Sequence, residues 1–323
     1  MNDEISKLME MVHNPQEIEE DNSVIGMLRV RKANEWTAEA ASRPDPKPLW
    51  DCLWNEGEVC CLFADSNLGK SILGVEIATE ISKTQRVIYY DFELSDKQFQ
   101  LRYTDAQGNI YRFPDNFLRG EVDVDGFCGG DFEDEVLVSI EKQAEAQGVK
   151  VLIIDNLTWL CNASEKGDAA GILMQNLMTL KKRHGWSILV IAHTPKRSLS
   201  SPITQNDLAG SKKLFNFFDS VFAMGQSAQD PNLRYIKQLK VRAGAFKYDA
   251  DNVVTCEVIK EGAWLHFQRI GYGAERSHLQ EPSEKDREAQ VNQARELQAK
   301  GKTQREIATL MGISAAKVNR LLK

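Results

Sequence analysis

One run of residues early in the chain has the types and order needed to hold phosphate groups. The apolar segment 60–63 leads into a tight loop, and Gly69-Lys70-Ser71 then opens a predicted helix. Backbone N–H groups and a helix N-terminus attract phosphates, a lysine reaches the β- and γ-oxygens, and a serine hydroxyl ligates Mg²⁺. The expected ligand is therefore Mg-ATP, bound by Ala64, Asp65, Ser66, Asn67, Leu68, Gly69, Lys70 and Ser71.

This loop departs from the usual G-x-x-x-x-G-K-[ST] pattern at its first position, where the chain has Ala64. Alanine is the smallest possible replacement for glycine, although its Cβ restricts the backbone angle φ. The alternative is a helix N-terminus whose Gly-Lys-Ser arises by chance. The apolar strand before the loop and the helix after it favour nucleotide binding.

Two carboxylates further along the chain could complete such a site. Residues 151–155 are four apolar residues that end in Asp155, the pattern of a buried strand whose acid holds Mg²⁺. Ser71 and Asp155 are therefore the predicted metal ligands. Glu93 follows another apolar strand, and a carboxylate at that strand end can orient water in line with the γ-phosphate. The alternative for Glu93 is a solvated acid that precedes a helix.

The elements that must position these side chains alternate between strand and helix patterns. Runs rich in β-branched and aromatic residues predict strands at 58–64, 86–92, 117–122, 150–155, 187–192 and 220–224. Helical patterns lie between them at 71–83, 132–147 and 169–184. This alternation predicts an α/β fold, with a mainly parallel sheet covered by helices on both faces. Strand patterns at 234–241, 252–259 and 264–268 predict an antiparallel extension of that sheet.

From residue 50 to about residue 268 the chain resembles the RecA-like ATPases, and among them the DnaB-type and plasmid RepA-type hexameric helicases. The resemblance rests on the phosphate loop and on two strand ends, Asp91-Phe92-Glu93-Leu94-Ser95 and Ala192-His193-Thr194-Pro195-Lys196. It implies that Glu93 polarises the attacking water and that His193 senses the γ-phosphate. The alternative for His193 is a buried histidine without a catalytic role.

Two further segments take their expected roles from the same resemblance. Residues 240–244 (KVRAG) are similar to the segment that DnaB-type proteins project into a neighbouring subunit's ATP site, which implies that Lys240 and Arg242 act in trans. The site would then be complete only in a ring or filament, expected to be a hexamer; the alternative is a solvated basic edge strand. Residues 195–210 correspond to the channel-facing loop, where Lys196 and Arg197 could contact single-stranded DNA, or to a surface loop without DNA.

The last part of the chain, residues 285–323, predicts three short helices. Thr303 and Glu306 form a capping box, and Ser314 caps the last helix. The segment resembles the helix-turn-helix of resolvases and transposases. That resemblance implies duplex DNA binding through Thr303, Ser314, Ala315, Lys317, Asn319 and Arg320. The alternative is a helical bundle used for protein contacts.

Composition and charge limit the other possibilities. Hydrophobic residues make up 42% and charged residues 27%, as in an ordinary globular protein. The net charge is −7, yet residues 283–323 carry nine Lys/Arg against five Asp/Glu, so the local balance is +4 and the remainder carries −11. DNA contact is therefore expected to be localised. No apolar run approaches the roughly 20 residues that span a bilayer, and the acidic N-terminus does not resemble a signal peptide, so a cytoplasmic protein without membrane contact is expected.

The sequence thus predicts four segments: an acidic arm and linker at 1–45, a RecA-like ATPase domain at 46–271, a linker at 272–284 and a helix-turn-helix module at 285–323. The leading hypothesis is an oligomeric, DNA-binding ATPase that hydrolyses Mg-ATP, specifically a helicase of a plasmid, phage or other mobile element. One alternative is a DNA-binding regulator whose ATPase core switches assembly without unwinding. Another is a scaffold that binds nucleotide without turnover.

Overall fold

The computed structural model describes residues 24–126, 129, 132–157, 159, 169–194, 197–208, 212–242, 244–281, 284–311, 313 and 315–322. The chain divides into two compact units, Met1–Pro46 and Lys47–Lys323. In the first unit the strands β1 (Val24–Ile25) and β2 (Leu28–Arg29) pair antiparallel, and helix α2 (Ala33–Ala41) follows without a buried residue. The second unit contains the large sheet and all the residues discussed below.

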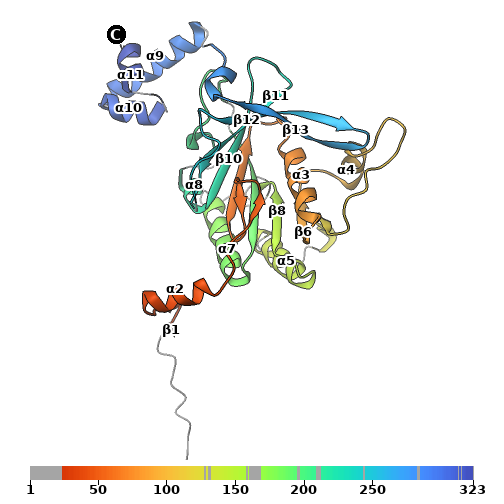
Figure 1. Cartoon of the computed structure of the whole chain (residues 1–323). Helices are drawn as coiled ribbons and strands as arrows, with labels where there is room; N and C mark the ends of the chain where they lie inside the picture. Colours follow the sequence, from red (N-terminus) through yellow and green to blue (C-terminus); the bar gives the residue numbers. More distant parts are fainter. Residues whose placement is uncertain are drawn as a thin grey trace, which may run out of the picture. The chain divides into compact units, whose positions relative to one another are not determined.

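A nine-stranded sheet organises the second unit (Figure 1), in the order β13-β12-β11-β10-β5-β9-β8-β6-β7. The six strands from β10 to β7 pair in parallel, while β11, β12 and β13 are antiparallel. The bounds are β5 (Val59–Ala64), β6 (Val87–Asp91), β7 (Phe117–Gly120), β8 (Val151–Asp155), β9 (Ser187–His193), β10 (Ser220–Gln226), β11 (Leu233–Lys240), β12 (Val253–Glu261) and β13 (Trp264–Gly273). The predicted parallel sheet with an antiparallel extension is confirmed.

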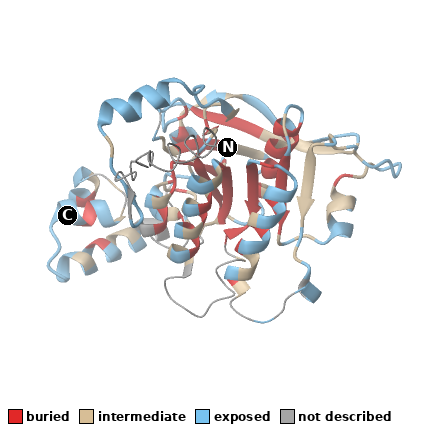
Figure 2. Cartoon of the chain, turned by 90° about the horizontal axis from the view of Figure 1, so that it is seen from below, coloured by how far each residue is buried: buried red, intermediate tan, exposed pale blue. Residues whose placement is uncertain are grey.

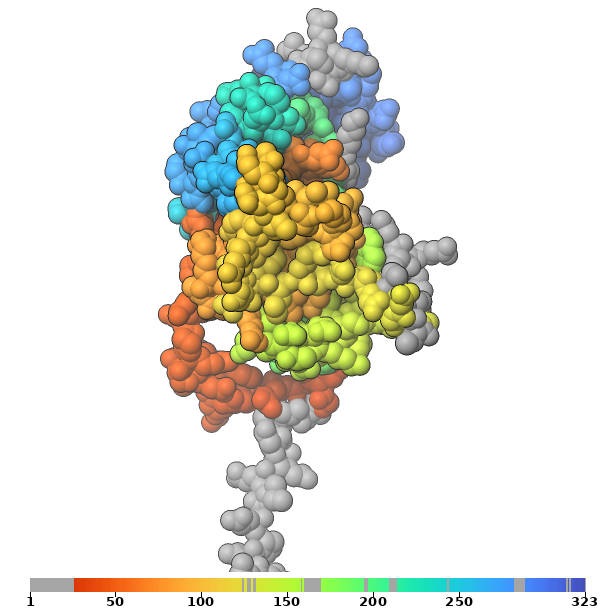
Figure 3. Space-filling view, turned by 90° about the vertical axis from the view of Figure 1, so that its right-hand side faces the viewer, coloured from red at the N-terminus to blue at the C-terminus, as the bar shows by residue number. Residues whose placement is uncertain are grey.

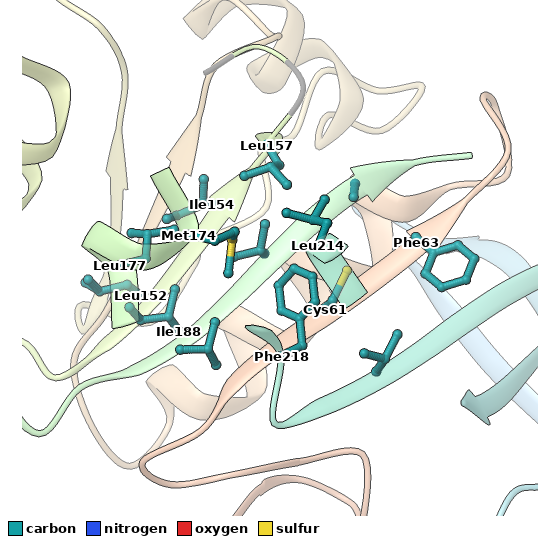
Figure 4. Packing of buried hydrophobic residues seen from close by; sticks show 14 of the residues in the cluster. Cys61, Phe63, Leu152, Ile154, Leu157, Met174, Leu177, Ile188, Leu214 and Phe218 are labelled. Carbon is teal, nitrogen blue, oxygen red and sulfur yellow. The ribbon is translucent and has the colours of Figure 1, made fainter. Parts of the chain in front are cut away.

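Helices cover both faces of this sheet and leave its strands buried between them (Figure 2). Helix α3 (Lys70–Ser82) packs on one face, where Leu73 and Ile77 meet Leu62. Helices α5 (Phe132–Ala146), α7 (Ala169–His184) and α8 (Lys212–Phe217) pack on the other face. Figure 4 shows that second layer, in which Met174 and Leu177 lie against Leu152 and Ile154. All six residues of β5 are buried, so the strand that leads into the phosphate loop is held from both sides.

The segment between β6 and β7 was not predicted as structured. It contains helix α4 (Asp96–Arg102), which begins with a capping box formed by Ser95 and Gln98. In the space-filling view of Figure 3 this segment lies between the strands β12 and β13 and helix α5. It packs through aromatic rings, since Tyr111 stacks on Trp264 with ring centroids 4.4 Å apart. A separate hairpin, β3 (Pro48–Trp50) with β4 (Trp54–Asn55), precedes β5.

The end of the chain forms three helices, α9 (Glu284–Ala299), α10 (Gln304–Met311) and α11 (Ala315–Leu322). They share a small core of Ala294, Ile307, Ala308 and Val318. The expected cap at Thr303 is present, because its hydroxyl accepts a hydrogen bond from the backbone N–H of Glu306 at 3.3 Å. Among the described residues, no helix is both long and apolar enough to cross a membrane.

Candidate nucleotide site

The loop between β5 and α3 has the backbone geometry of a phosphate cradle. Gly69 precedes the first residue of α3 with a φ of 98°, and a Cβ added there would come 2.9 Å from the Phe267 ring. Both facts require glycine at this position. Ala64 instead remains paired within the sheet, opposite His193 of β9, and its φ is not positive. Its Cβ is therefore compatible with this loop, which explains why the usual first glycine can be replaced.

Lys70 lies inside this cradle. Its side-chain ammonium donates hydrogen bonds to the carbonyl oxygens of Ala64 and Asp65, both at 3.0 Å, and only 6% of the residue is exposed. Burial lowers the pKa of Lys70, while the carboxylates of Asp155 and Glu93 act in the opposite direction. A buried ammonium held by two neutral carbonyls is incompletely neutralised, so it would attract an anion in the cavity strongly.

Asp155 ends β8, next to the strands β6 and β9, and is 2% exposed. Tyr89 donates a hydrogen bond to its Oδ2 at 2.5 Å, and the Ser71 hydroxyl is a second partner. Burial raises the pKa of Asp155 to about 6 in spite of these hydrogen bonds. The two predicted metal ligands are thus neighbours. Both offer oxygen atoms, which Mg²⁺ prefers, so the donor set fits that ion.

Glu93 and His193 come from the ends of two different strands and meet. Their Oε1 and Nε2 atoms are 3.3 Å apart. Asn156 lies between them: its amide donates to Glu93 Oε1 and is 3.1 Å from His193 Nε2. The backbone N–H of Trp159 donates to the Asn156 Oδ1 at 2.9 Å, so the amide nitrogen must face Glu93. Asn156 was missed by the sequence analysis, although its place directly after Asp155 was a usable signal.

The turn that carries Glu93 is built by Asp91. Its carboxylate accepts hydrogen bonds from the backbone N–H groups of Glu93 at 3.2 Å and Leu94 at 2.9 Å. Arg119 holds the same carboxylate at 3.1 Å and also donates to the Leu94 carbonyl at 2.6 Å. Asp91 is therefore satisfied by structural partners, and Glu93, whose side chain is 43% exposed, remains the carboxylate open to the site.

These groups line one cavity of about 430 Å³. Its lining residues are Ser66, Asn67, Gly69, Lys70, Ser71, Ile72, Glu93, Arg102, Asp155 and His193. The structure thus brings together the predicted phosphate-binding, metal-binding and water-orienting residues. Arg102, at the end of α4, was not predicted, because no motif marks it and only the path of α4 directs it to the cavity.

The residues predicted to act in trans lie away from this cavity. Lys240 donates to the carbonyl oxygens of Phe215 at 3.1 Å and Asn216 at 3.2 Å. Arg242 pairs with Asp219 at 2.6 Å. Lys240 is opposite Val221, which begins the parallel pairing with β5, whereas the phosphate loop follows the end of β5. They therefore lie at the opposite edge of the sheet from their own nucleotide site, and a role in a neighbouring subunit stays a prediction.

The expected channel-facing arginine is turned inward. The Arg197 side chain is 8% exposed, because its guanidinium donates to the Ser201 carbonyl at 2.8 Å and to the Tyr235 hydroxyl at 3.3 Å and faces Asp65. The expectation of a surface position for Arg197 is corrected by this burial. Lys196, the other residue predicted there, lies outside the described residues.

The residues predicted to contact duplex DNA are only partly described. Ala315, Asn319 and Arg320 are exposed on α11, Lys317 is half-buried, and Ser314 lies outside the described residues. The Thr303 side chain is engaged in the helix cap, where its hydroxyl also donates to Glu306 Oε2 at 3.0 Å. Their contact with DNA stays a prediction.

Comparisons with known proteins agree with this geometry. A family model described as an AAA domain matches residues 28–198, more than half of the chain. A KaiC-like protein from the hyperthermophilic archaeon Pyrococcus horikoshii is similar in structure, with a TM-score of 0.52 and 12% identity over 69% of this chain and 96% of that chain. The ATPase domain of a DnaB-like helicase gives a TM-score of 0.54 and 11% identity over 72% of this chain and 95% of that chain. No curated protein matches the chain at a significant level. The predicted RecA-like fold is confirmed.

Proposed function

The chain belongs to the AAA domain family, and on that premise we propose that it binds Mg-ATP in the 430 Å³ cavity and hydrolyses it. The observation that carries the proposal is the meeting of Lys70, Ser71, Asp155, Glu93 and His193 around one space, although they come from the ends of different strands. A scaffold that only binds nucleotide has no need for a carboxylate and an imidazole held together beside the phosphate loop.

Each side chain has a separate task in this reaction. Lys70 exchanges the carbonyl oxygens of Ala64 and Asp65 for phosphate oxygens when ATP binds. Ser71 and Asp155 hold the metal, which when bound neutralises charge on the phosphate oxygens. Glu93 orients the attacking water and accepts its proton, and the Asn156 amide keeps that carboxylate in place.

We also propose that the active protein is an oligomer, a ring or filament, in which Lys240 and Arg242 reach the nucleotide of a neighbouring subunit. Support comes from their distance in the fold from their own cavity, and from Arg242, whose side chain is 56% exposed in spite of its pair with Asp219. The C-terminal helices then bring the oligomer to duplex DNA through the exposed face of α11, with Asn319 and Arg320. Coupled to turnover, this arrangement gives a helicase of the DnaB or RepA type that acts for a mobile element.

The test measures phosphate release from ATP, with and without Mg²⁺ and with and without single- and double-stranded DNA. Metal-dependent turnover is expected, and DNA is expected to stimulate it. No release above background under any condition would contradict hydrolysis and leave the nucleotide-binding scaffold. A strand-displacement assay on the same preparation separates a helicase from a regulator that hydrolyses ATP without unwinding.

Duplex binding is tested by deleting residues 283–323, which should remove most duplex affinity and leave basal hydrolysis intact. Arg320→Ala is the milder probe, because each lost phosphate contact lowers the slope of log affinity against log salt by about 0.9. Equal duplex affinity and salt slope in the full and truncated chains would assign DNA binding elsewhere.

A further inference from the structure

A buried ion pair connects the phosphate loop to the segment that follows β9. The Nε atom of Arg197 is 3.6 Å from Asp65 Oδ2, and the two side chains are 8% and 24% exposed. Neither residue lines the nucleotide cavity. The pair therefore cannot touch ATP directly, yet it acts on the second residue of the loop that binds the phosphates.

Residues 64 and 65 are held from two directions. On the cavity side, Lys70 donates to both of their carbonyl oxygens. On the other side, the backbone N–H of Thr194 donates to the Ala64 carbonyl at 3.2 Å, and Arg197 faces the Asp65 carboxylate. The second set of contacts comes entirely from the chain just after His193.

Arg197 is itself fixed by rigid partners. Its guanidinium donates to the Ser201 carbonyl and to the Tyr235 hydroxyl, and Tyr235 is fully buried on β11. The Tyr235 ring fills the space beside Gly225, where an added Cβ would come within 2.3 Å of it. A planar guanidinium with several fixed donors is suited to hold a carboxylate at a set position.

Phosphate binding requires Lys70 to leave the two carbonyl oxygens, which removes the cavity-side contacts of residues 64 and 65. We propose that Arg197 is a positioning residue that then keeps Asp65, and with it the phosphate loop, in the open shape that accepts ATP. This inference rests on the proposed function of the cavity, and it assigns to Arg197 a role in nucleotide affinity in place of a contact with DNA.

The experiment is a mutant cycle on the full-length chain with Arg197→Ala, Asp65→Ala and the double variant. The KM for ATP and the Kd for a fluorescent ATP analogue should each rise about tenfold in both single variants, the size expected from one lost charge-assisted contact. The double variant should be no worse than either single one, because the two residues act through the same contact. The kcat should stay within about twofold, since Glu93 and His193 are untouched.

Three further measurements distinguish positioning from a general loss of structure. Arg197→Lys, which keeps the charge, should recover part of the affinity, and Asp65→Asn serves as the loss variant if Arg197→Ala does not fold. Tyr235→Phe removes one support of the guanidinium without touching Asp65 and should keep KM close to the wild-type value. Affinity for a single-stranded oligonucleotide should not change in any variant.

Unchanged KM and Kd in Arg197→Ala would overturn the proposal, as would effects that multiply in the double variant. Loss of single-stranded DNA affinity with unchanged KM would overturn it in favour of a DNA contact. The Kd is measured without turnover. A wild-type protein that fails to hydrolyse ATP therefore contradicts the proposed function alone, and the Kd cycle still decides the role of Arg197.

Discussion

The two edges of the parallel sheet treat charge in different ways. At the edge where β5, β6, β8 and β9 end, Lys70 is buried against neutral carbonyl oxygens, and burial raises the pKa of Asp155 to about 6. At the opposite edge, Asp219 is paired with Lys181 at 2.7 Å and with Arg242 at 2.6 Å. The first edge keeps its charges incompletely neutralised, and the second neutralises them within the chain.

This difference separates a site prepared for a ligand from a cluster that stabilises the fold. Buried charges without close ion partners make folding less favourable and are retained where a ligand completes them. Paired charges carry no such requirement. The comparison predicts that removing a charge at the nucleotide edge damages function, whereas removing one at the opposite edge damages stability.

The largest effect is expected from Lys70→Ala. The variant loses the lysine that lines the cavity and should lose ATP binding by two orders of magnitude or more, as expected for a phosphate-binding charge inside a low-dielectric cavity. Isothermal titration with ATP and Mg²⁺ measures this loss. The unfolding midpoint without nucleotide should not fall, because the buried ammonium is held there by neutral carbonyl oxygens; wild-type affinity in the variant would break the comparison.

A smaller effect is expected when Arg242 is replaced by alanine. The assembled protein should lose roughly tenfold or more in kcat, because an arginine that stabilises transition-state charge is removed from the neighbouring site. Mixing Arg242→Ala subunits with Lys70→Ala subunits tests the arrangement, since each spoils a different half of an interface and some mixed interfaces are intact. No recovered activity in a mixture that demonstrably co-assembles would confine Arg242 to its pair with Asp219.

Stability gives the smallest effects, and they should have opposite signs at the two edges. A carboxyl whose pKa is raised from 3.8 to about 6 destabilises the folded state by about 3 kcal/mol once it is ionised. Asp155→Asn without Mg²⁺ should therefore raise the free energy of unfolding at pH 7 by on the order of 2 kcal/mol. Because the folded state takes up the proton first as the pH falls, the gain should shrink between pH 6 and pH 4.

Asp219→Asn is the matched control for that measurement. It leaves Lys181 and Arg242 without their shared carboxylate and should lower the free energy of unfolding by on the order of 2 kcal/mol. Denaturant unfolding of both variants measures the two signs. Destabilisation by Asp155→Asn, or stabilisation by Asp219→Asn, would remove the physical basis for treating the two edges differently.

The sequence predicted the elements and residues whose signals are local. The phosphate loop, Asp155 and Glu93 each combine an apolar run with a polar residue at its end, and period and position suffice to place them at one edge of a parallel sheet. The helix cap at Thr303 is local in the same sense and is present.

Residues whose position depends on contacts between distant segments were not predictable in this way. Arg102 reaches the cavity only because α4 folds back after Glu93, and Asn156 matters because β6 and β9 bring Glu93 and His193 to it. Arg197 was expected at the surface since it follows a strand in a polar segment. Its actual partners, Asp65 and Tyr235, come from strands that are neighbours of β9 only in the folded sheet or beyond.

The central claim is that the cavity hydrolyses ATP with Glu93 as the group that orients water, and Glu93→Gln tests it most directly. Phosphate release should be followed at saturating Mg-ATP, together with the affinity for the fluorescent ATP analogue. We predict unchanged affinity and a fall in kcat on the order of 10²-fold or more, because the amide keeps the shape of the carboxylate but cannot accept the proton. A variant with near wild-type kcat would contradict the account.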